Sequence, residues 1–149
     1  ESLCSVAFAD AFHASRGNAL WATLSEAEKE QALRRFTTHA SGRYRSRWQG
    51  ERVSSAQPMD WPRAGVVADG YLLASTTIPE DIQAAWAMGA FKAAAEDLDA
   101  DLERGVKAET VGPITTVYDE KSSRVKQYAA IDRLLQPYLK SGGMMLVRA

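Results

Sequence analysis

The sequence has 149 residues, of which 46% are hydrophobic and 25% are charged, and its formal net charge is −1. This composition is typical of a globular domain, and it excludes a disordered chain or a polycation that coats nucleic acid. One domain of this length buries roughly two thirds of the surface that its unfolded chain exposes, so it needs no metal or disulfide to fold.

The N-terminal half carries the signals of two helices. Ser5 can cap a first helix that runs to about Arg16, where the following Gly-Asn pair supplies a left-handed stop. Ser25 and Glu28 form a capping box at the start of a second helix. Apolar residues then follow at helical spacing as far as Tyr44, which indicates one stripe of this helix turned toward the core.

Residues 49–77 contain several prolines and glycines and show little periodicity. We interpret them as a long loop with a short strand around Tyr71 to Leu73. A loop of this length is uncommon inside a compact domain unless it has a function or rests on a partner.

A third helix is expected to begin at Ile78-Pro79, because proline and acidic residues are favoured in a first turn. It is expected to end at Gly105 and to be the longest helix. Gly89 and several alanines keep its surface small, so another helix can approach it closely. A last helix is expected from about Tyr128 to Tyr138. The sequence therefore predicts a mainly α fold, a small helical bundle with a long central helix.

Two further segments are expected to leave this bundle. Residues 106–118 have strand-like composition around a central Gly-Pro pair, which predicts a projecting β-hairpin. Two strands alone are marginally stable, so this hairpin is expected to rest on something. Residues 141–149 place an apolar stretch after two glycines, which is typical of a mobile C-terminal tail that docks on its own domain or on a neighbour.

The charges are unevenly distributed along the sequence. Residues 34–63 hold seven arginines against two acids, and residues 80–109 hold eight acids against three basic residues. Each segment therefore has an excess of five charges, and the two excesses are opposite in sign. These segments can be two solvated faces, can pair within the chain or between copies, or can face different partners.

Patterns for catalysis, metals and membranes are missing from the sequence. Cys4 is the single cysteine, which excludes an intramolecular disulfide and a cysteine-based zinc site. There is no phosphate-binding glycine loop, no G-x-S-x-G motif and no histidine pair at ligand spacing. No apolar run reaches the roughly 20 residues of a membrane-spanning helix. We therefore expect no enzyme, no cofactor, no metal and no membrane partner, and we expect no secretion.

Two weaker chemical signals have structural explanations. His13 and His39 stand alone on helices and are interpreted as packed or surface histidines rather than as ligands or bases. The acidic run at 97–101 begins like a calcium loop. However, Leu102 and Ala108 stand where such a loop needs a glycine and a bidentate acid, so the run is interpreted as a solvated acidic face.

The strongest functional pattern is the run Arg43-Tyr44-Arg45-Ser46-Arg47-Trp48. Guanidinium groups bind phosphates and aromatic rings stack on bases, so this run can form a nucleic-acid-binding surface. If the run is helical, its two aromatic residues lie four positions apart, face the core and leave the arginines as a basic ridge. Trp61, which precedes a proline, either plugs a core edge or anchors an interface.

Short motifs follow one another in a fixed order over nearly the whole chain. They are Ser5-Val6-Ala7, Asp10-Ala11-Phe12-His13, Arg16-Gly17-Asn18, Trp21, Arg43-Tyr44, Trp48 to Gly50, Trp61-Pro62-Arg63-Ala64-Gly65, Ile78-Pro79, Glu109 to Ile114, Tyr118-Asp119, Ile131 to Leu135 and Gly142-Gly143. In their order and spacing they resemble a family of small tailed-phage structural proteins, the head-tail adaptors. This family also carries the description DnaT-like single-strand-DNA-binding protein. Phe8 departs from it, since an acidic residue is expected there.

The resemblance implies one head-tail adaptor domain over residues 1–149, in a ring of about twelve copies beneath the portal protein. It implies contacts with other neck or tail proteins and a channel through which genomic double-stranded DNA passes without sequence-specific contact. The implied location is the virion neck, and the host cytoplasm during assembly. The alternative function is a single-stranded nucleic-acid-binding module that uses residues 43–48.

Two sets of candidate site residues follow. The candidates for a subunit interface or a DNA-facing surface are Arg43, Arg45, Arg47, Arg52, Trp61, Arg63, Asp97 and Asp101. The candidates for docking on the portal or on a neighbouring copy are Val111, Ile114, Met144, Met145, Leu146 and Val147. A head-to-tail ring needs two unlike surfaces on each copy, and the basic and acidic segments are one candidate pair.

Overall fold

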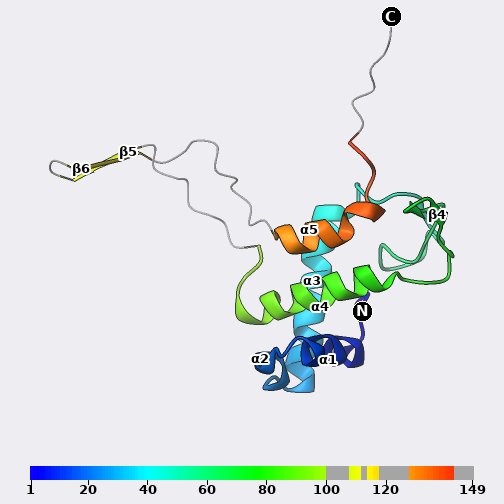
Figure 1. The fold of residues 1–149 in the computed structure, drawn as a ribbon, viewed down its shortest axis with the longest axis horizontal. Coiled ribbons are helices and arrows are strands. Elements are labelled where there is room, and N and C mark those ends of the chain that lie inside the picture. Colours follow the sequence, from blue (N-terminus) through cyan, green and yellow to red (C-terminus); the bar gives the residue numbers. More distant parts are fainter. Residues whose placement is uncertain (100–107, 112–113, 118–127, 143–149) are drawn as a thin grey trace, which may run out of the picture.

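The computed structural model of the chain describes residues 1–99, 108–111, 114–117 and 128–142 (Figure 1). Within these residues the helices are α1 (Val6–Ser15), α2 (Ala19–Ala22), α3 (Glu26–Tyr44), α4 (Glu80–Ala95), α5 (Ala129–Leu135) and the 3-10 helix η1 (Gln136–Tyr138). The strands are β1 (Glu51–Arg52), β2 (Arg63–Ala64), β3 (Val67–Ala68), β4 (Tyr71–Leu72), β5 (Ala108–Val111) and β6 (Ile114–Val117). The expected mainly α fold is confirmed.

Local capping fixes where the first helices begin. The Ser5 hydroxyl accepts a hydrogen bond from the Phe8 amide at 3.1 Å and caps α1. At the start of α3 the Ser25 hydroxyl accepts from the Glu28 amide at 3.3 Å, and the Glu28 carboxylate accepts from the Ser25 amide at 2.7 Å. Both predicted caps are therefore confirmed, and each satisfies amides that an isolated helix end would leave unpaired.

Helix α4 is shorter than the sequence pattern predicts. It ends at Ala95, ten residues before Gly105, and its 16 residues make it shorter than α3 with 19, so both expectations are wrong. Glu96 is already extended, and the Asp97 carboxylate accepts a hydrogen bond from the Asp99 amide at 3.1 Å. Carboxylates oppose the negative end of the helix dipole, and such local bonds compete with helical ones, so the acidic run stops the helix.

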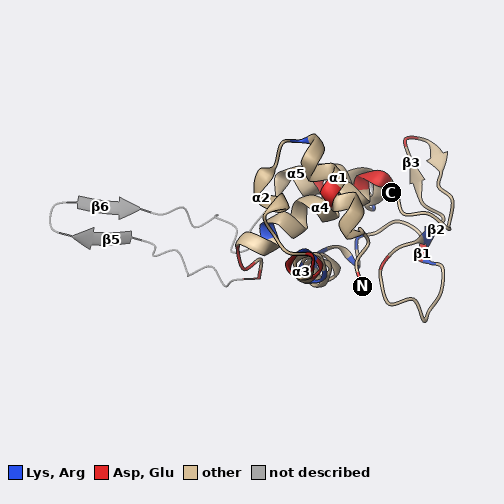
Figure 2. Ribbon diagram, turned by 90° about the horizontal axis from the view of Figure 1, so that it is seen from below, with Lys and Arg blue, Asp and Glu red and all other residues tan. Residues whose placement is uncertain are grey.

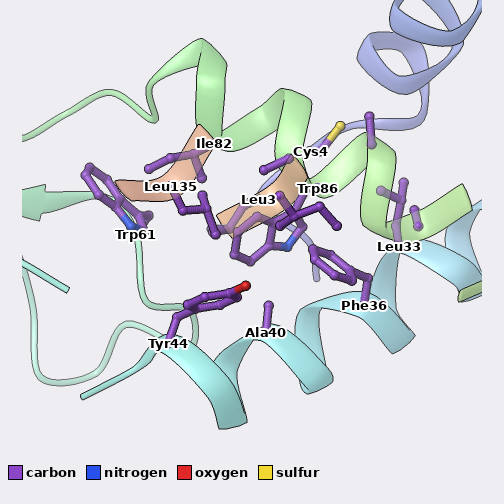
Figure 3. Close-up of a cluster of buried hydrophobic side chains, with 14 of the residues drawn as sticks. Leu3, Cys4, Leu33, Phe36, Ala40, Tyr44, Trp61, Ile82, Trp86 and Leu135 are labelled. Carbon is purple, nitrogen blue, oxygen red and sulfur yellow. The ribbon is translucent and has the colours of Figure 1, made fainter. Parts of the chain in front are cut away.

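The core forms where α3 and α4 cross, with α1 below the crossing and α5 beside α4 (Figure 1). Phe36, Ala40 and Tyr44 project from α3 toward Trp86 of α4 (Figure 3). Gly89 lies at the crossing, where a Cβ atom would overlap the Phe36 ring. The close helix approach that the small residues predicted is therefore confirmed, and it depends on Gly89.

Segments far apart in the sequence supply the rest of the core through aromatic contacts. Trp48 packs edge-on against Trp61 with ring centres 5.6 Å apart, and its ring centre lies 6.4 Å from that of Trp86. Trp61 in turn packs edge-on against Tyr138 of η1 at 6.0 Å. Edge-to-face and tilted ring pairs are favoured by the quadrupoles of the rings, so this chain of contacts ties the loop and the C-terminal helices to α4.

The long loop between α3 and α4 is held by two short strand pairs. β1 pairs with β2 and β3 pairs with β4, both antiparallel, and β4 confirms the short strand expected around Tyr71. The buried Arg63 guanidinium donates to three backbone carbonyls, those of Gln49 at 2.7 Å, Gly50 at 2.7 Å and Asp60 at 3.1 Å. These bonds satisfy a buried cation and give the loop a defined shape.

The C-terminal elements agree with the sequence expectations in the residues that are described. β5 and β6 pair antiparallel, with Ala108 opposite Val117 and Val111 opposite Ile114, which confirms a hairpin within residues 106–118. Helix α5 continues into η1, where Pro137 lies in the first turn. The expected tail lies almost wholly outside the described residues. None of the described helices is long and apolar enough to cross a lipid bilayer.

The packing at Gly89 gives a first prediction. The substitution Gly89→Ala is expected to lower the free energy of unfolding by about 1–3 kcal/mol, because the added methyl group forces the Phe36 ring to move within a packed core. Gly42→Ala is the matched control, because Gly42 lies in α3 with open space around it. Alanine there is expected to raise the free energy of unfolding by roughly 0.5–1 kcal/mol. Urea unfolding of both variants measures the difference, and equal stability of the two would refute this account.

His13 gives a second prediction. Its Nε2 atom lies 3.0 Å from the Ala87 carbonyl and its Nδ1 atom 3.2 Å from the Asn18 amide nitrogen, an arrangement that suits a neutral ring with the proton on Nε2. Burial lowers the pKa of His13 below its usual value, although its bond to Ala87 opposes the shift. Below the unfolded-state pKa of about 6.5 the unfolded chain binds a proton that the folded chain resists, so stability falls as the pH drops.

The expected contribution of His13 to this loss is at most about 1.4 kcal/mol per pH unit, the limit for one proton. Urea unfolding between pH 7.5 and pH 5 should therefore show that the stability difference between the native chain and His13→Gln shrinks toward low pH. A difference that stays constant over this range would count against a buried neutral histidine.

Candidate polyanion-binding groove

The arginine-aromatic run turns its two rings inward. Tyr44 and Trp48 are each 1% exposed, and the Trp48 indole N–H donates to the Asp60 carboxylate at 3.4 Å. The interpretation that both rings face the core is therefore confirmed, although α3 ends at Tyr44 and Trp48 lies beyond the helix. Stacking on bases requires an exposed ring, and neither ring of this segment is exposed.

The arginines of the basic segment differ in their surroundings. Arg43 pairs with Asp132 of α5 at 3.1 Å, and Arg45 lies 3.6 Å from the buried carboxylate of Asp60. Arg52 donates to the Gln57 carbonyl at 2.8 Å. Arg47 is exposed, with its guanidinium 5.7 Å from the centre of the Tyr44 ring. The segment is therefore no uniform ridge, since part of its charge is used to hold the domain together.

Two of the candidate interface residues lie inside the domain. Trp61 has no exposed surface, and Arg63 is 8% exposed with its guanidinium bound to backbone carbonyls. Trp61 therefore fills an edge of the core, which is the first of the two alternatives that the sequence left open. Neither side chain offers a surface to a partner in this conformation, because the fold needs both to pack and pin the long loop.

The end of α3 and the C-terminal segment together form a groove that the sequence did not indicate. An antiparallel bridge joins Trp48 to Leu139, and the Lys140 amide donates to the Arg47 carbonyl at 2.7 Å. The resulting groove has a volume of about 840 Å³. Its polar lining includes Arg43, Arg47, Gln49, Asp132, Arg133 and Lys140.

Asp132 is the one acidic residue among these six, and its carboxylate is hydrogen-bonded to neighbouring side chains. The Asp132 carboxylate accepts hydrogen bonds from the Tyr44 hydroxyl and from Arg43. Burial and the Asp132 carboxylate together raise the pKa of Tyr44 above its usual value, so its hydroxyl stays protonated as a donor at neutral pH. Among the described residues no carboxylate lies within ion-pair distance of Arg47, Arg133 or Lys140. The groove is therefore a cationic surface.

Sequence reasoning missed Arg133 and Lys140. Both lie more than 80 residues from Arg47 in the sequence, on elements without an unusual local charge. The contact that brings them to Arg47 is tertiary, so no local pattern could have found it. The charges of both signs around α3 are visible in Figure 2.

The structure describes only some of the acidic and apolar candidate site residues. Asp97 lies exposed just after α4, and the nearby Asp99 pairs with the Nδ1 atom of His39. Val111 and Ile114 are opposite each other at the end of the β5–β6 pair. The remaining candidates lie outside the described residues: Asp101, Met144, Met145, Leu146 and Val147.

The described residues offer little for catalysis. Burial raises the pKa of the Cys4 thiol to about 12, so it stays protonated and unreactive at neutral pH. His13 and His39 are both buried, in agreement with their interpretation as packed histidines. Among the described residues no group of three or more His, Cys, Asp or Glu side chains is placed to hold a metal ion.

A second surface of interest is the β3–β4 pair, which carries exposed apolar side chains. Tyr71 is 76% exposed, Leu72 is 72% exposed and Val67 is 46% exposed. We call Val67, Tyr71 and Leu72 the apolar ribbon. The register pairs Val67 with Leu72, so these two share one face of the strand pair and Tyr71 extends from the other. Exposed apolar side chains gathered on one element are typical of a protein contact site.

Comparison with known proteins gives one result. The sequence model of a family described as "Putative DnaT-like ssDNA binding protein" matches residues 1–149. No curated protein matches the chain, and no solved structure does. The family description names a binding protein and not a class of enzyme. Because the match covers the whole sequence, the chain belongs to the DnaT-like single-stranded-DNA-binding protein family.

Proposed function

We propose that this chain is a noncatalytic head-to-tail adaptor of a tailed phage. In this function about twelve copies form a ring beneath the portal protein, contact other neck or tail proteins, and let genomic double-stranded DNA pass through the channel. The motifs over the whole sequence that resemble head-tail adaptors support this proposal. The location would be the virion neck, and the host cytoplasm before assembly.

The observation that carries the proposal is the apolar ribbon. Tyr71 and Leu72 are more than 70% exposed although the domain has buried four tryptophans elsewhere. A monomer gains nothing from exposing these side chains, whereas a subunit of an assembly buries them against its neighbour. The hairpin at 106–118 and the tail at 141–149 are further proposed contacts with a neighbouring copy or the portal.

A ring also requires that each copy present two unlike surfaces. The proposal takes the apolar ribbon as one of these surfaces, and the segments at 106–118 and 141–149 as the candidates for the other. Contacts between unlike surfaces are heterologous, and they close into a ring when the rotation between copies is right. The proposal therefore assigns the ribbon to subunit contacts.

The ribbon gives a testable prediction. The double substitution Tyr71→Ser with Leu72→Ser is expected to abolish ring formation on purified portal while leaving the free energy of unfolding within about 0.5 kcal/mol, because exposed side chains add little to folding. Leu20→Ser is the matched control, since Leu20 is exposed on α2 outside the ribbon. Mass measurement and electron microscopy of the portal-bound species give the readout. A double variant that still forms complete rings would rule out the ribbon as the contact.

A second candidate function, a single-stranded-DNA-binding module, is favoured by the family description and by the cations of the groove. The two functions differ in the affinity that they require. An adaptor is expected to bind a single-stranded oligonucleotide no tighter than about 1 µM near physiological salt, within the range of nonspecific binding. Fluorescence anisotropy with a labelled thymidine oligonucleotide measures this affinity. A nanomolar dissociation constant without any binding to the portal would favour the second function over the first.

A further inference from the structure

We propose that the groove binds the sugar-phosphate backbone of DNA and does not distinguish single strands from duplex. The groove is the one described above, with Arg47, Arg133 and Lys140 as its exposed cations. This inference rests on the proposed nucleic-acid contact of the groove and is independent of the ring contact assigned to the apolar ribbon.

The first reason is the charge that the groove keeps available. Asp132 is occupied by Arg43 and by the Tyr44 hydroxyl, so it does not neutralise the other cations. In the part of the chain that the structure describes, Arg47, Arg133 and Lys140 have no carboxylate at ion-pair distance. Three cations along one open groove suit a chain of phosphates, because each phosphate contact releases bound counterions.

The second reason is that backbone contacts hold the segments of two of the three cations, Arg47 and Lys140, beside each other. The Lys140 amide bonds to the Arg47 carbonyl, and the Lys140 ammonium group lies 3.4 Å from the Ser46 carbonyl. The Gln49 side chain donates to the Pro137 carbonyl at 2.8 Å and accepts from the Val67 amide at 3.2 Å. The Gln49 amide is thus used by the fold, which leaves it unsuited to hydrogen bonding with a base.

The third reason is that no aromatic face is available for bases. None of the described residues that line the groove is aromatic, and the nearby Tyr44 and Trp48 are buried. Preference for single strands comes from stacking of unpaired bases on exposed rings, whereas phosphates are common to both forms of DNA. A groove with cations and without rings therefore contacts the backbone alone.

An acidic protein segment is the competing occupant of a cationic groove. Protein contact sites have an apolar centre with a polar rim. Most of the side chains that line this groove are polar, and none of the large exposed apolar side chains of the described residues lies in it, whereas three of them form the ribbon. The distribution of polar and apolar side chains therefore favours DNA in the groove and protein on the ribbon.

The test compares a labelled thymidine 20-mer with a 20-base-pair duplex by fluorescence anisotropy at several salt concentrations, using the whole chain. With three phosphate contacts, affinity is expected to fall roughly 40-fold for duplex and roughly 20-fold for single strand between 50 and 200 mM salt. At 50 mM salt the two dissociation constants are expected to agree within about threefold.

Variants assign the binding to the groove. Arg133→Gln combined with Lys140→Gln is expected to make the slope of log affinity against log salt shallower by about 1.8 for the duplex and by about 1.4 for the single strand. Arg16→Gln combined with Arg34→Gln removes the same charge outside the groove and is expected to leave both slopes unchanged. Thermal unfolding confirms that each variant is folded.

Four outcomes would overturn the inference. The first is no binding of either DNA at 50 mM salt, and the second is equal loss of binding in the control variant. The third is a tenfold or greater preference for the single strand, above all one that Tyr71→Ala removes. The fourth is a groove variant that keeps its DNA binding but loses ring formation, since this would assign the groove to a protein partner. A failed ring assay with unchanged DNA binding would instead count against the adaptor function.

Discussion

Burial of the Trp48 side chain is the interaction on which both the core and the groove depend. Its indole contacts Trp61 of the loop and Trp86 of α4, and its backbone pairs with Leu139 near the C-terminus. A large apolar ring just beyond a helix end must be covered, and these three segments converge to cover it. Because Trp48 points inward, the neighbouring Arg47 points outward beside Lys140, so the groove is a consequence of how the core closes.

The basic segment has two physical roles that its composition does not separate. Arg63 and Arg43 are bound within the domain, the first by backbone carbonyls and the second by Asp132. Arg47 remains outside and joins residues from the C-terminal segment. Buried cations need full hydrogen bonding, and the fold supplies it from the carbonyls of a loop that has few regular partners. The number of arginines in this segment is therefore larger than the number that a partner can contact.

The apolar ribbon and the cationic groove lie on different elements of this small domain. The ribbon is formed by β3 and β4, whereas the groove is formed by the end of α3, α5 and η1. A protein that joins copies of itself around DNA needs one surface for protein and another for phosphate. Both proposals use this separation, and neither requires a catalytic group.

The sequence by itself determined the elements whose signals are local. The capping box at Ser25, the stop after Arg16 and the strand pair around residues 106–118 follow from hydrogen bonds and turns between near neighbours. The inward placement of Tyr44 also followed from the helical spacing of α3, whereas Trp48 lies beyond the end of that helix and is buried by tertiary contacts. The early end of α4 was missed, because the pattern of apolar residues continued past the acids that stop the helix.

Only the tertiary structure decided which charged residues share a surface. Arg47 meets Arg133 and Lys140 through packing of the C-terminal helices on the end of α3, and Arg63 is withdrawn from the surface by carbonyls of the loop. Ion pairs and grooves between distant segments depend on how the core closes, which has no signature in local spacing. The sequence therefore determined the helix starts and the turns that have local signals, and the close packing around Trp48 decided the site.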